Sequence, residues 1–179
     1  MKVVVIRHAE VDFCWNRRST SDGFDADCSG YDSAPVKEIK YEIPLLGYQR
    51  IYISELSRSR STAEVLFPEH DYAESGLINE VPLRSGFDTG KKMPLWFWNT
   101  LGRLQWFTNN KRQAEGRDQT RERARQFITM IASENMDCAV VTHGFFMHTL
   151  LQEMKKAGFR INKSSAAYKN GECVVAVKG

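Results

Sequence analysis

The sequence predicts a three-layer α/β/α sandwich with a largely parallel central sheet. Residues 3–6 and 138–141 are uninterrupted apolar runs that lack the alternation of a half-exposed strand, so we expect strands covered on both faces. Helical spacing of apolar or small residues follows these strand patterns, and strand–helix units of this kind place parallel strands side by side. With 179 residues, 42% of them hydrophobic, the chain is long enough for one domain, which we assign to 1–179.

The first apolar run ends in Arg7 and His8, which we expect at the carboxyl edge of the sheet, where α/β proteins commonly bind ligands. At that edge an arginine can donate two hydrogen bonds to an anion, and a neutral imidazole nitrogen beside it can attack the anion. An Arg-His pair alone is more often part of a solvated loop. Two further segments favour the catalytic interpretation.

The second segment joins a short strand at 50–54 to a helix that begins at Ser57. One helix face carries mainly small side chains, which allows close packing on a sheet: Ser59, Thr62, Ala63 and Leu66. Arg58 lies in the expected first turn, where free backbone N–H groups already favour an anion. Arg60, by contrast, is interpreted as an exposed charge.

The third segment repeats the first, with a buried strand followed by His143. Gly144 permits a tight turn into a helix. That helix has an apolar face formed by Met147, Leu150, Leu151 and Met154. The remaining histidines, His70 in a loop and His148 away from this face, are interpreted as packing or surface residues.

In this order, the three segments resemble the histidine phosphatase superfamily, which contains the cofactor-dependent phosphoglycerate mutases. The motifs are strand-Arg-His-Ala-Glu ending at residue 10, Leu-x-Arg-x-x-x-Thr-Ala at 56–63 and Val-Val-x-His-Gly at 140–144. Each motif is weak alone, whereas the ordered triple is specific. The resemblance covers about residues 1–12, 50–66, 76–80 and 115–151, with a weaker match at 172–177. It implies a phosphoglycerate mutase-like fold and the phosphatase branch of the family.

By resemblance, His8 is the nucleophile that becomes phosphohistidine, while Arg7, Arg58 and His143 bind the transferring phosphoryl group. Family members also place an acidic proton donor after the next strand, and Glu80 occupies that position. These roles agree with the chemistry, because a phosphoryl-transfer transition state spreads negative charge that two arginines and a second histidine can stabilise. Neighbouring cations should also lower the pKa of His8 and keep it neutral.

Residues 11–46 depart from the family pattern. Family members follow the first motif closely with an asparagine that contacts phosphate, whereas here Asn16, Arg17 and Arg18 come later. We treat these three as candidate substrate contacts, the alternative being a solvated loop. The Ser/Asp/Gly-rich residues 19–33 are interpreted as an open polar loop.

Residues 92–107 are aromatic on nearly all sides of any helix drawn through them. In the family this interval often carries a cap over the active site, so we expect a helical cap insert around 90–112. We also expect one or two of the aromatic side chains to line the pocket. The alternative is that they form the ordinary core of a small helical insert.

The composition excludes several classes of function. The net charge is only +3, and the arginines between 117 and 125 fit the exposed face of an amphipathic helix, so no nucleic acid partner is expected. The four cysteines lack metal-ligand spacing, which predicts no metal and no cofactor, and Cys138 and Cys173 are expected to be buried thiols. No segment is long enough to span a membrane, and Arg7 interrupts the N-terminal apolar run, so we expect a cytoplasmic protein.

Together these features predict a metal-independent phosphomonoesterase that hydrolyses a phosphorylated small molecule through a phosphohistidine intermediate. A phosphoprotein is the alternative substrate. Three other functions stay open: a phosphoglycerate-type mutase, a compact phosphohistidine protein phosphatase, and a non-catalytic phosphate-binding relative. The sequence determines neither the substrate nor the oligomeric state.

Overall fold

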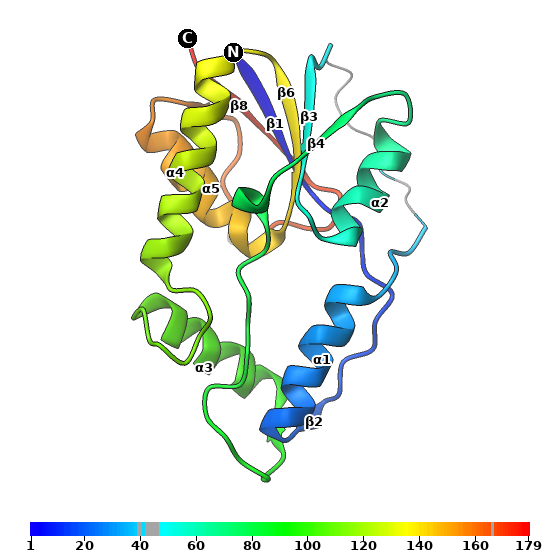
Figure 1. Ribbon diagram of the computed structural model, residues 1–179, viewed down its shortest axis with the longest axis vertical. Helices are drawn as coiled ribbons and strands as arrows, with labels where there is room; N and C mark the ends of the chain where they lie inside the picture. Colours follow the sequence, from blue (N-terminus) through cyan, green and yellow to red (C-terminus); the bar gives the residue numbers. More distant parts are fainter. Residues whose placement is uncertain (39–40, 42–46, 166) are drawn as a thin grey trace.

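A computed structural model describes residues 1–38, 41, 47–165 and 167–179. Within these residues a six-stranded sheet has the order β4-β3-β6-β1-β8-β7, and β2 pairs with β5 in a separate ribbon (Figure 1). The strands are β1 (Lys2–Arg7), β2 (Arg18–Ser19), β3 (Arg50–Ile53), β4 (Tyr72–Glu74), β5 (Met93–Pro94), β6 (Cys138–Thr142), β7 (Arg160–Ile161) and β8 (Cys173–Val177). The helices are α1 (Ser21–Ser33), α2 (Ser57–Leu66), the 3₁₀ turn η1 (Gly76–Ile78), α3 (Leu95–Phe107), α4 (Arg117–Glu134) and α5 (Gly144–Lys156).

The centre of the main sheet is parallel. Strand β6 lies between β1 and β3 and pairs in parallel with both, and β4 continues in parallel beside β3. On the other side, β8 pairs antiparallel with β1, and β7 pairs antiparallel with β8. The predicted largely parallel sheet is therefore confirmed. The carboxyl ends of β1, β3 and β6 meet at one edge.

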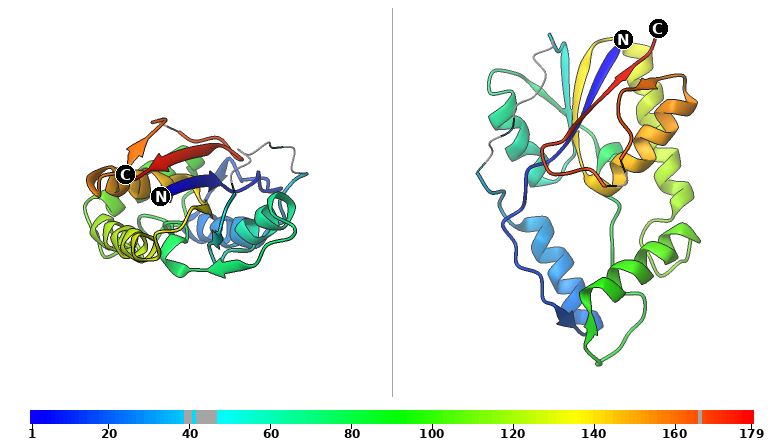
Figure 2. Two further views of the ribbon diagram at one scale, coloured as in Figure 1. Left: turned by 90° about the horizontal axis from the view of Figure 1, so that it is seen from above. Right: turned by 180° about the vertical axis from the view of Figure 1, so that it is seen from behind.

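Helices cover both faces of the sheet, which confirms the predicted three-layer sandwich (Figures 1 and 2). Val3 and Val5 point into the core formed with α4 and α5, whereas Val4 and Ile6 point into the core formed with α2. All four side chains are fully buried. Because both faces of β1 are covered, the strand needs apolar residues at every position, and this produces the unbroken run in the sequence.

Helices α1 and α3 lie beyond the carboxyl edge of the parallel strands, at the end opposite the two chain termini (Figures 1 and 2). The prediction of an open loop at 19–33 is wrong, because most of that segment is α1. The Oγ1 atom of Thr20 caps the helix by accepting a 3.2 Å hydrogen bond from Gly23 N. Phe24 is buried and stacks on Trp98 of α3 with ring centroids 5.8 Å apart. One cap and one aromatic contact thus stabilise a helix whose polar composition resembles that of a loop.

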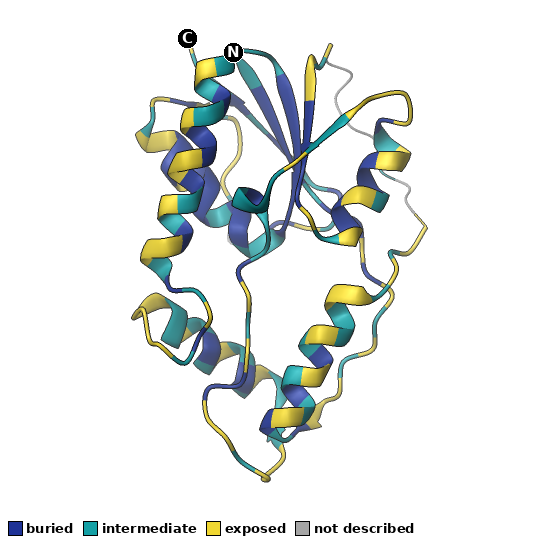
Figure 3. Cartoon of the chain, in the orientation of Figure 1, coloured by how far each residue is buried: buried dark blue, intermediate teal, exposed yellow. Residues whose placement is uncertain are grey.

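The helix predicted within 92–107 is α3, and its aromatic residues mostly serve packing. Trp98 is buried, and Trp106 packs edge-on against Phe145 of α5 with ring centroids 4.8 Å apart. Trp96 and Phe107 are exposed, and α1 and α3 both alternate between buried and exposed residues (Figure 3). The rings of Trp98 and Trp106 therefore pack against α1 and α5, respectively.

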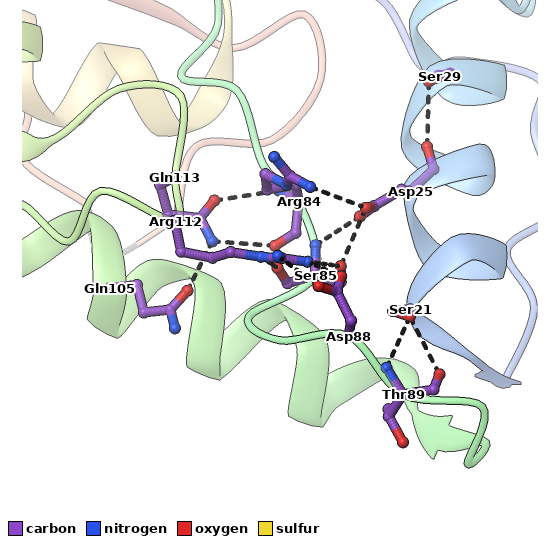
Figure 4. A network of polar contacts seen from close by, with 10 residues as sticks. All are labelled: Ser21, Asp25, Ser29, Arg84, Ser85, Asp88, Thr89, Gln105, Arg112 and Gln113. Carbon is purple, nitrogen blue, oxygen red and sulfur yellow. Dashed lines mark hydrogen bonds and ion pairs between the residues drawn. The ribbon is translucent and has the colours of Figure 1, made fainter.

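A polar network fixes α1 relative to the loop that precedes α3 (Figure 4). The Asp25 carboxylate accepts hydrogen bonds of 2.6 Å from Ser85 N and 3.0 Å from Ser85 Oγ. Arg112 donates to the Ser85 carbonyl at 3.0 Å, and Thr89 N donates to Ser21 Oγ at 3.0 Å. The residues that form these hydrogen bonds come from segments far apart in the sequence. The network therefore ties α1 to the chain on both sides of α3.

Candidate active site

Two predicted histidines meet at the sheet edge because β1 and β6 are neighbouring parallel strands. Arg7 pairs in register with Thr142, so His8 and His143 each follow their strand by one residue. Their ring centroids lie 5.0 Å apart, and His8 N donates to the Thr142 carbonyl at 2.8 Å. We refer to Arg7, His8, Arg58 and His143 as the strand-tip cluster.

His8 is held as a neutral base with one free ring nitrogen. Its Nδ1 lies 2.6 Å from the carbonyl oxygen of Ala9. A carbonyl only accepts, so Nδ1 carries the proton and Nε2 keeps its lone pair. Burial and the charges of Arg58 and Arg7 lower the pKa of His8 from its ordinary 6.5 to about 3. The neutral imidazole is therefore the form present at physiological pH.

Arg58 and His143 are linked by a hydrogen bond that also fixes the histidine tautomer. Arg58 Nε donates to His143 Nδ1 at 3.2 Å, so the ring proton resides on Nε2, which donates to Ser54 Oγ at 2.6 Å. Burial, followed by the charges of His8 and Arg58, holds the pKa of His143 well below its ordinary value. We expected His143 to supply positive charge, but in this arrangement it is neutral. The positive charge of the cluster comes from Arg7 and Arg58.

Gly144 allows Arg7 to lie against the N-terminus of α5. A Cβ atom on Gly144 would lie 2.8 Å from Arg7 Nε, too close for a side chain unless the guanidinium moved. Arg7 Nη1 donates to the carbonyl of Tyr168, while Nε is buried without a hydrogen-bond partner in the described part of the chain. A buried guanidinium donor beside a helix N-terminus is suited to an anion.

The loop before β8 holds the tip of β1 in place. Asn170 Nδ2 donates to the carbonyl oxygens of His8 at 3.0 Å and Ala9 at 3.1 Å, and Gly171 N donates to the Arg7 carbonyl at 3.0 Å. The Ala9 carbonyl is also the acceptor for His8 Nδ1, so Asn170 orients the nucleophile candidate indirectly. Sequence reasoning missed Asn170, because a single asparagine in a polar loop carries no spacing signal.

Helix α2 is joined to β1 through one threonine. Thr62 Oγ1 accepts a 2.9 Å hydrogen bond from Ala9 N and donates at 2.6 Å to the Arg58 carbonyl. Arg58 itself is 1% exposed, and its guanidinium lies 5.1 Å from the ring centre of Tyr31. The small face predicted for α2 is thus the face that brings Arg58 to His8.

Glu80 lies at the N-terminus of α5. Its Oε1 accepts hydrogen bonds from Phe146 N and Val81 N, both at 2.9 Å, and Oε2 accepts one from Phe145 N at 3.3 Å. These donors fix the carboxylate at the same sheet edge as the strand-tip cluster. Glu80 therefore lies beside the N-terminal turn of α5 that follows His143.

Arg123 positions the segment that leads to Glu80. Its Nη1 donates to the carbonyls of Leu77 at 2.9 Å and Asn79 at 3.0 Å, and its guanidinium pairs with Glu115 at 3.0 Å. Arg123 was predicted on the exposed face of α4, but its side chain is only 19% exposed. Amphipathic spacing missed it because an arginine can reach backbone carbonyls of a neighbouring segment from the edge of a polar face.

A cavity of about 800 Å³ lies between the sheet edge and helices α1 and α3. Arg58 and Glu80 line it, whereas His8 and His143 are 1% and 0% exposed and are not among its lining residues. Helix α1 contributes five lining residues, namely Asp25, Cys28, Ser29, Tyr31 and Asp32. Helix α3 contributes Leu95, Asn99 and Arg103.

The prediction that aromatic residues from 92–107 line the pocket is wrong for this cavity. Those rings pack against α1 and α5 or face solvent, and the aromatic lining residues are instead Trp15 and Tyr31. Arg103 reaches the cavity by stacking on Phe145, with its guanidinium carbon 3.6 Å from the ring centre. Periodicity alone did not single out Arg103, which lies within the aromatic segment.

Asn16, Arg17 and Arg18 are exposed and do not line the cavity. Asn16 Nδ2 donates to Asp27 at 2.8 Å, and the Arg18 side chain donates to the Lys92 carbonyl at 3.0 Å. The Arg17 carbonyl accepts a backbone hydrogen bond from the first residue of α3. The structure therefore gives these residues structural contacts around α1 and α3 and does not bring them to the strand-tip cluster.

Residues 3–175 match the family model of the histidine phosphatase superfamily (branch 1). The chain belongs to the histidine phosphatase superfamily. No curated protein matches it.

Solved structures of similar fold include several phosphatases. The α-ribazole phosphatase of Shigella flexneri is 13% identical, with a TM-score of 0.61, over 98% of this chain and 89% of that one. The mycobacterial glucosyl-3-phosphoglycerate phosphatase is 16% identical, with a TM-score of 0.60, over 97% and 88%. A phosphoserine phosphatase variant of Entamoeba histolytica, in complex with phosphoserine, is 14% identical, with a TM-score of 0.56, over 97% and 89%. At these identities the similarity establishes the fold.

The described residues contain no group of three or more His, Cys, Asp and Glu side chains that could hold a metal ion. All four cysteines are free; Cys138 is buried as predicted, whereas Cys173 is half-buried. Among the helices of the described residues, none has the length and apolar character needed to cross a membrane.

Proposed function

We propose that this superfamily member is a phosphomonoesterase with His8 as covalent nucleophile. In this proposal Arg7 and Arg58 bind the phosphoryl group, His143 contributes to that binding by orienting Arg58 Nε, and Glu80 transfers the proton. One observation carries it: His8 is buried and neutral, a backbone carbonyl holds its Nδ1, and its free Nε2 belongs to a cluster with two arginines. The fold similarity to several phosphatases supports the same assignment.

In the first step, the lone pair of His8 Nε2 attacks phosphorus, and the N–P bond forms as the ester P–O bond breaks. The leaving oxygen takes a proton from Glu80. Catalysis of this step is mainly positioning and stabilisation of charge on the equatorial oxygens. Arg7 and Arg58 supply that charge.

In the second step, water attacks phosphorus, the N–P bond breaks and inorganic phosphate leaves. Glu80, now a carboxylate, takes the proton from water, which restores both residues. Three backbone N–H groups donate to the Glu80 carboxylate and fix its position at the N-terminus of α5.

The substrate class that we propose is a phosphorylated small molecule. A cavity of about 800 Å³ is within the usual size range of small-molecule sites, and it combines charged groups with apolar side chains such as Leu56 and Leu95. A phosphoprotein is the alternative substrate. We further propose that the reaction needs no metal, because two guanidinium groups at the cluster oppose a divalent cation, and that the protein is cytoplasmic, in keeping with its free cysteines.

Trapping the intermediate tests the proposal. Wild-type protein quenched with p-nitrophenyl phosphate should carry acid-labile, base-stable phosphate on His8, and His8→Ala should lose both the label and turnover. His70→Ala, at an exposed histidine, is the matched control and should behave as wild type. Retention of more than a few per cent of activity in folded His8→Ala would contradict the covalent mechanism.

A further inference from the structure

An acidic side chain of α1 lies directly on the buried arginine of the strand-tip cluster. Asp32 Oδ1 accepts a 2.9 Å hydrogen bond from Arg58 Nη1. The Arg58 side chain is 1% exposed and that of Asp32 is 55% exposed. Both residues line the cavity. The carboxylate therefore occupies the side of Arg58 that faces the cavity.

This contact uses the donor that a phosphoryl group needs. Arginine binds phosphate best through two parallel N–H donors of its fork. In Arg58, Nε is already committed to His143 Nδ1, so a two-pronged contact has to use Nη1. Nη1 is the atom that donates to Asp32. A phosphoryl oxygen in a two-pronged contact and the Asp32 carboxylate thus meet at the same nitrogen, where two anions lie close together and repel each other.

Asp32 can leave this contact without disturbing the fold. It is the last cavity-lining residue on α1, near the C-terminus of the helix, and more than half of its side chain is exposed. Asp25, on the same face, is held by Ser85 N and Oγ and therefore stays in place. Rotation of Asp32 into solvent exposes Arg58 Nη1 to the cavity, while the Arg58–His143 hydrogen bond can persist.

We propose that Asp32 is an affinity-determining residue of this site, because its carboxylate competes with the substrate phosphoryl group for Arg58 Nη1. The inference rests on the proposed function, in which Arg58 binds that group. Binding then exchanges one anion for another on a buried cation. The apparent affinity for phosphate is proportional to the fraction of molecules in which Asp32 has released Arg58. If Asp32 holds Arg58 in nine-tenths of the molecules, the affinity is about tenfold lower.

Direct binding of inorganic phosphate, measured by calorimetry, tests the competition without requiring turnover. Asp32→Asn keeps the shape of the side chain but removes its charge, and it should bind phosphate about tenfold more tightly than wild type. Asp22→Asn removes the same charge from an exposed position in the first turn of α1 and should stay within about twofold of wild type. In an Arg58→Ala background, the gain from Asp32→Asn should disappear, because the contested donor is gone.

Several outcomes are decisive. An unchanged or weaker phosphate affinity in Asp32→Asn, with phosphate bound by wild type, overturns the role of Asp32 and leaves the proposed function intact. A gain of equal size in Asp22→Asn also overturns it, because the effect is then one of net charge. Absence of phosphate binding in all variants up to tens of millimolar overturns the phosphate site itself. Asp32→Ala, checked for folding by circular dichroism, repeats the test if the asparagine makes a new hydrogen bond to Arg58.

Discussion

His8 and His143 face each other across two neighbouring parallel strands, with ring centroids 5.0 Å apart and both rings neutral. Each ring has one nitrogen fixed by an acceptor, the Ala9 carbonyl for His8 and Ser54 Oγ for His143. The second ring nitrogens differ in their partners. His143 Nδ1 accepts a hydrogen bond from Arg58, whereas His8 Nε2 keeps its lone pair for attack on phosphorus. Two histidines in equivalent strand positions are thereby given different chemistry.

The arginines should dominate stabilisation of the transition state. Loss of one preorganised electrostatic donor typically lowers the rate by roughly 10²- to 10³-fold, so Arg7→Ala and Arg58→Ala should each fall in this range. His143→Ala should fall there too, because it removes the acceptor that orients Arg58 Nε. The measurement is kcat for p-nitrophenyl phosphate.

Arg60→Ala is the matched control for Arg58→Ala. Arg60 lies two residues further along α2, is exposed and pairs with Glu74, so its removal should change kcat by less than about twofold. Equal damage from the two substitutions would mean that the alignment of α2 with the family motif is wrong.

Glu80→Gln should slow the reaction most for poor leaving groups. An alkyl phosphate needs a proton on its leaving oxygen, whereas p-nitrophenolate leaves without one. The amide should therefore reduce kcat by roughly 10²- to 10⁴-fold for an alkyl phosphate and much less for p-nitrophenyl phosphate. An equal loss with both substrates would indicate that Glu80 acts only in the water step or only in holding α5.

The stability of the fold should decrease as the pH falls below about 6.5. The pKa of His8 is lowered to about 3 and that of His143 is also depressed, so between these values and 6.5 the unfolded chain binds more protons than the native state. The free energy of unfolding should then fall by up to about 1.4 kcal/mol per pH unit for each histidine. Urea unfolding at pH 7, 6 and 5 measures this slope.

His8→Asn should make that pH dependence shallower, because one buried neutral imidazole is removed. The exposed His70→Asn should leave the slope as in wild type. A slope that is the same in all three proteins would show that carboxylates, not His8, control acid stability in this range.

The sequence predicted the parts of the fold that depend on short-range pattern. Uninterrupted apolar runs identified β1 and β6, and their shared direction placed His8 and His143 together. Helix α1 was missed because its stability comes from a Thr20 cap and from Phe24 stacking on Trp98, a contact between segments 74 residues apart in the chain. Contacts of that kind leave no local periodicity.

The same reason explains which site residues were missed. Motif spacing identified residues at strand tips and in the first turn of α2, since these positions have fixed neighbours. Asn170, Arg123 and Asp32 act through contacts across the fold, with backbone carbonyls or with Arg58, so their roles depend on tertiary packing. Asn16, Arg17 and Arg18 were proposed as displaced counterparts of the family's phosphate-contacting asparagine, and the structure gives them other contacts.

Chelation should leave the activity unchanged. The strand tips carry two guanidinium groups, and the described residues hold no group of three potential metal ligands. Activity after exhaustive dialysis against EDTA should therefore equal that of untreated protein. Loss of activity that is reversed by zinc or magnesium, and by no other addition, would contradict the proposed mechanism.

Hydrolysis should dominate over transfer to a second hydroxyl. A mutase has to keep water away from phosphorylated His8, whereas the cavity beside Arg58 is lined by polar groups on α1, among them Ser29 and the half-exposed Asp32. Incubation with 3-phosphoglycerate and a trace of 2,3-bisphosphoglycerate, followed by separate assays for inorganic phosphate and 2-phosphoglycerate, distinguishes the two. Release of phosphate from this or another monoester supports the phosphatase, and rapid formation of 2-phosphoglycerate would establish the mutase. Phosphate binding without turnover of any phosphorylated metabolite or phosphohistidine protein would establish the non-catalytic relative.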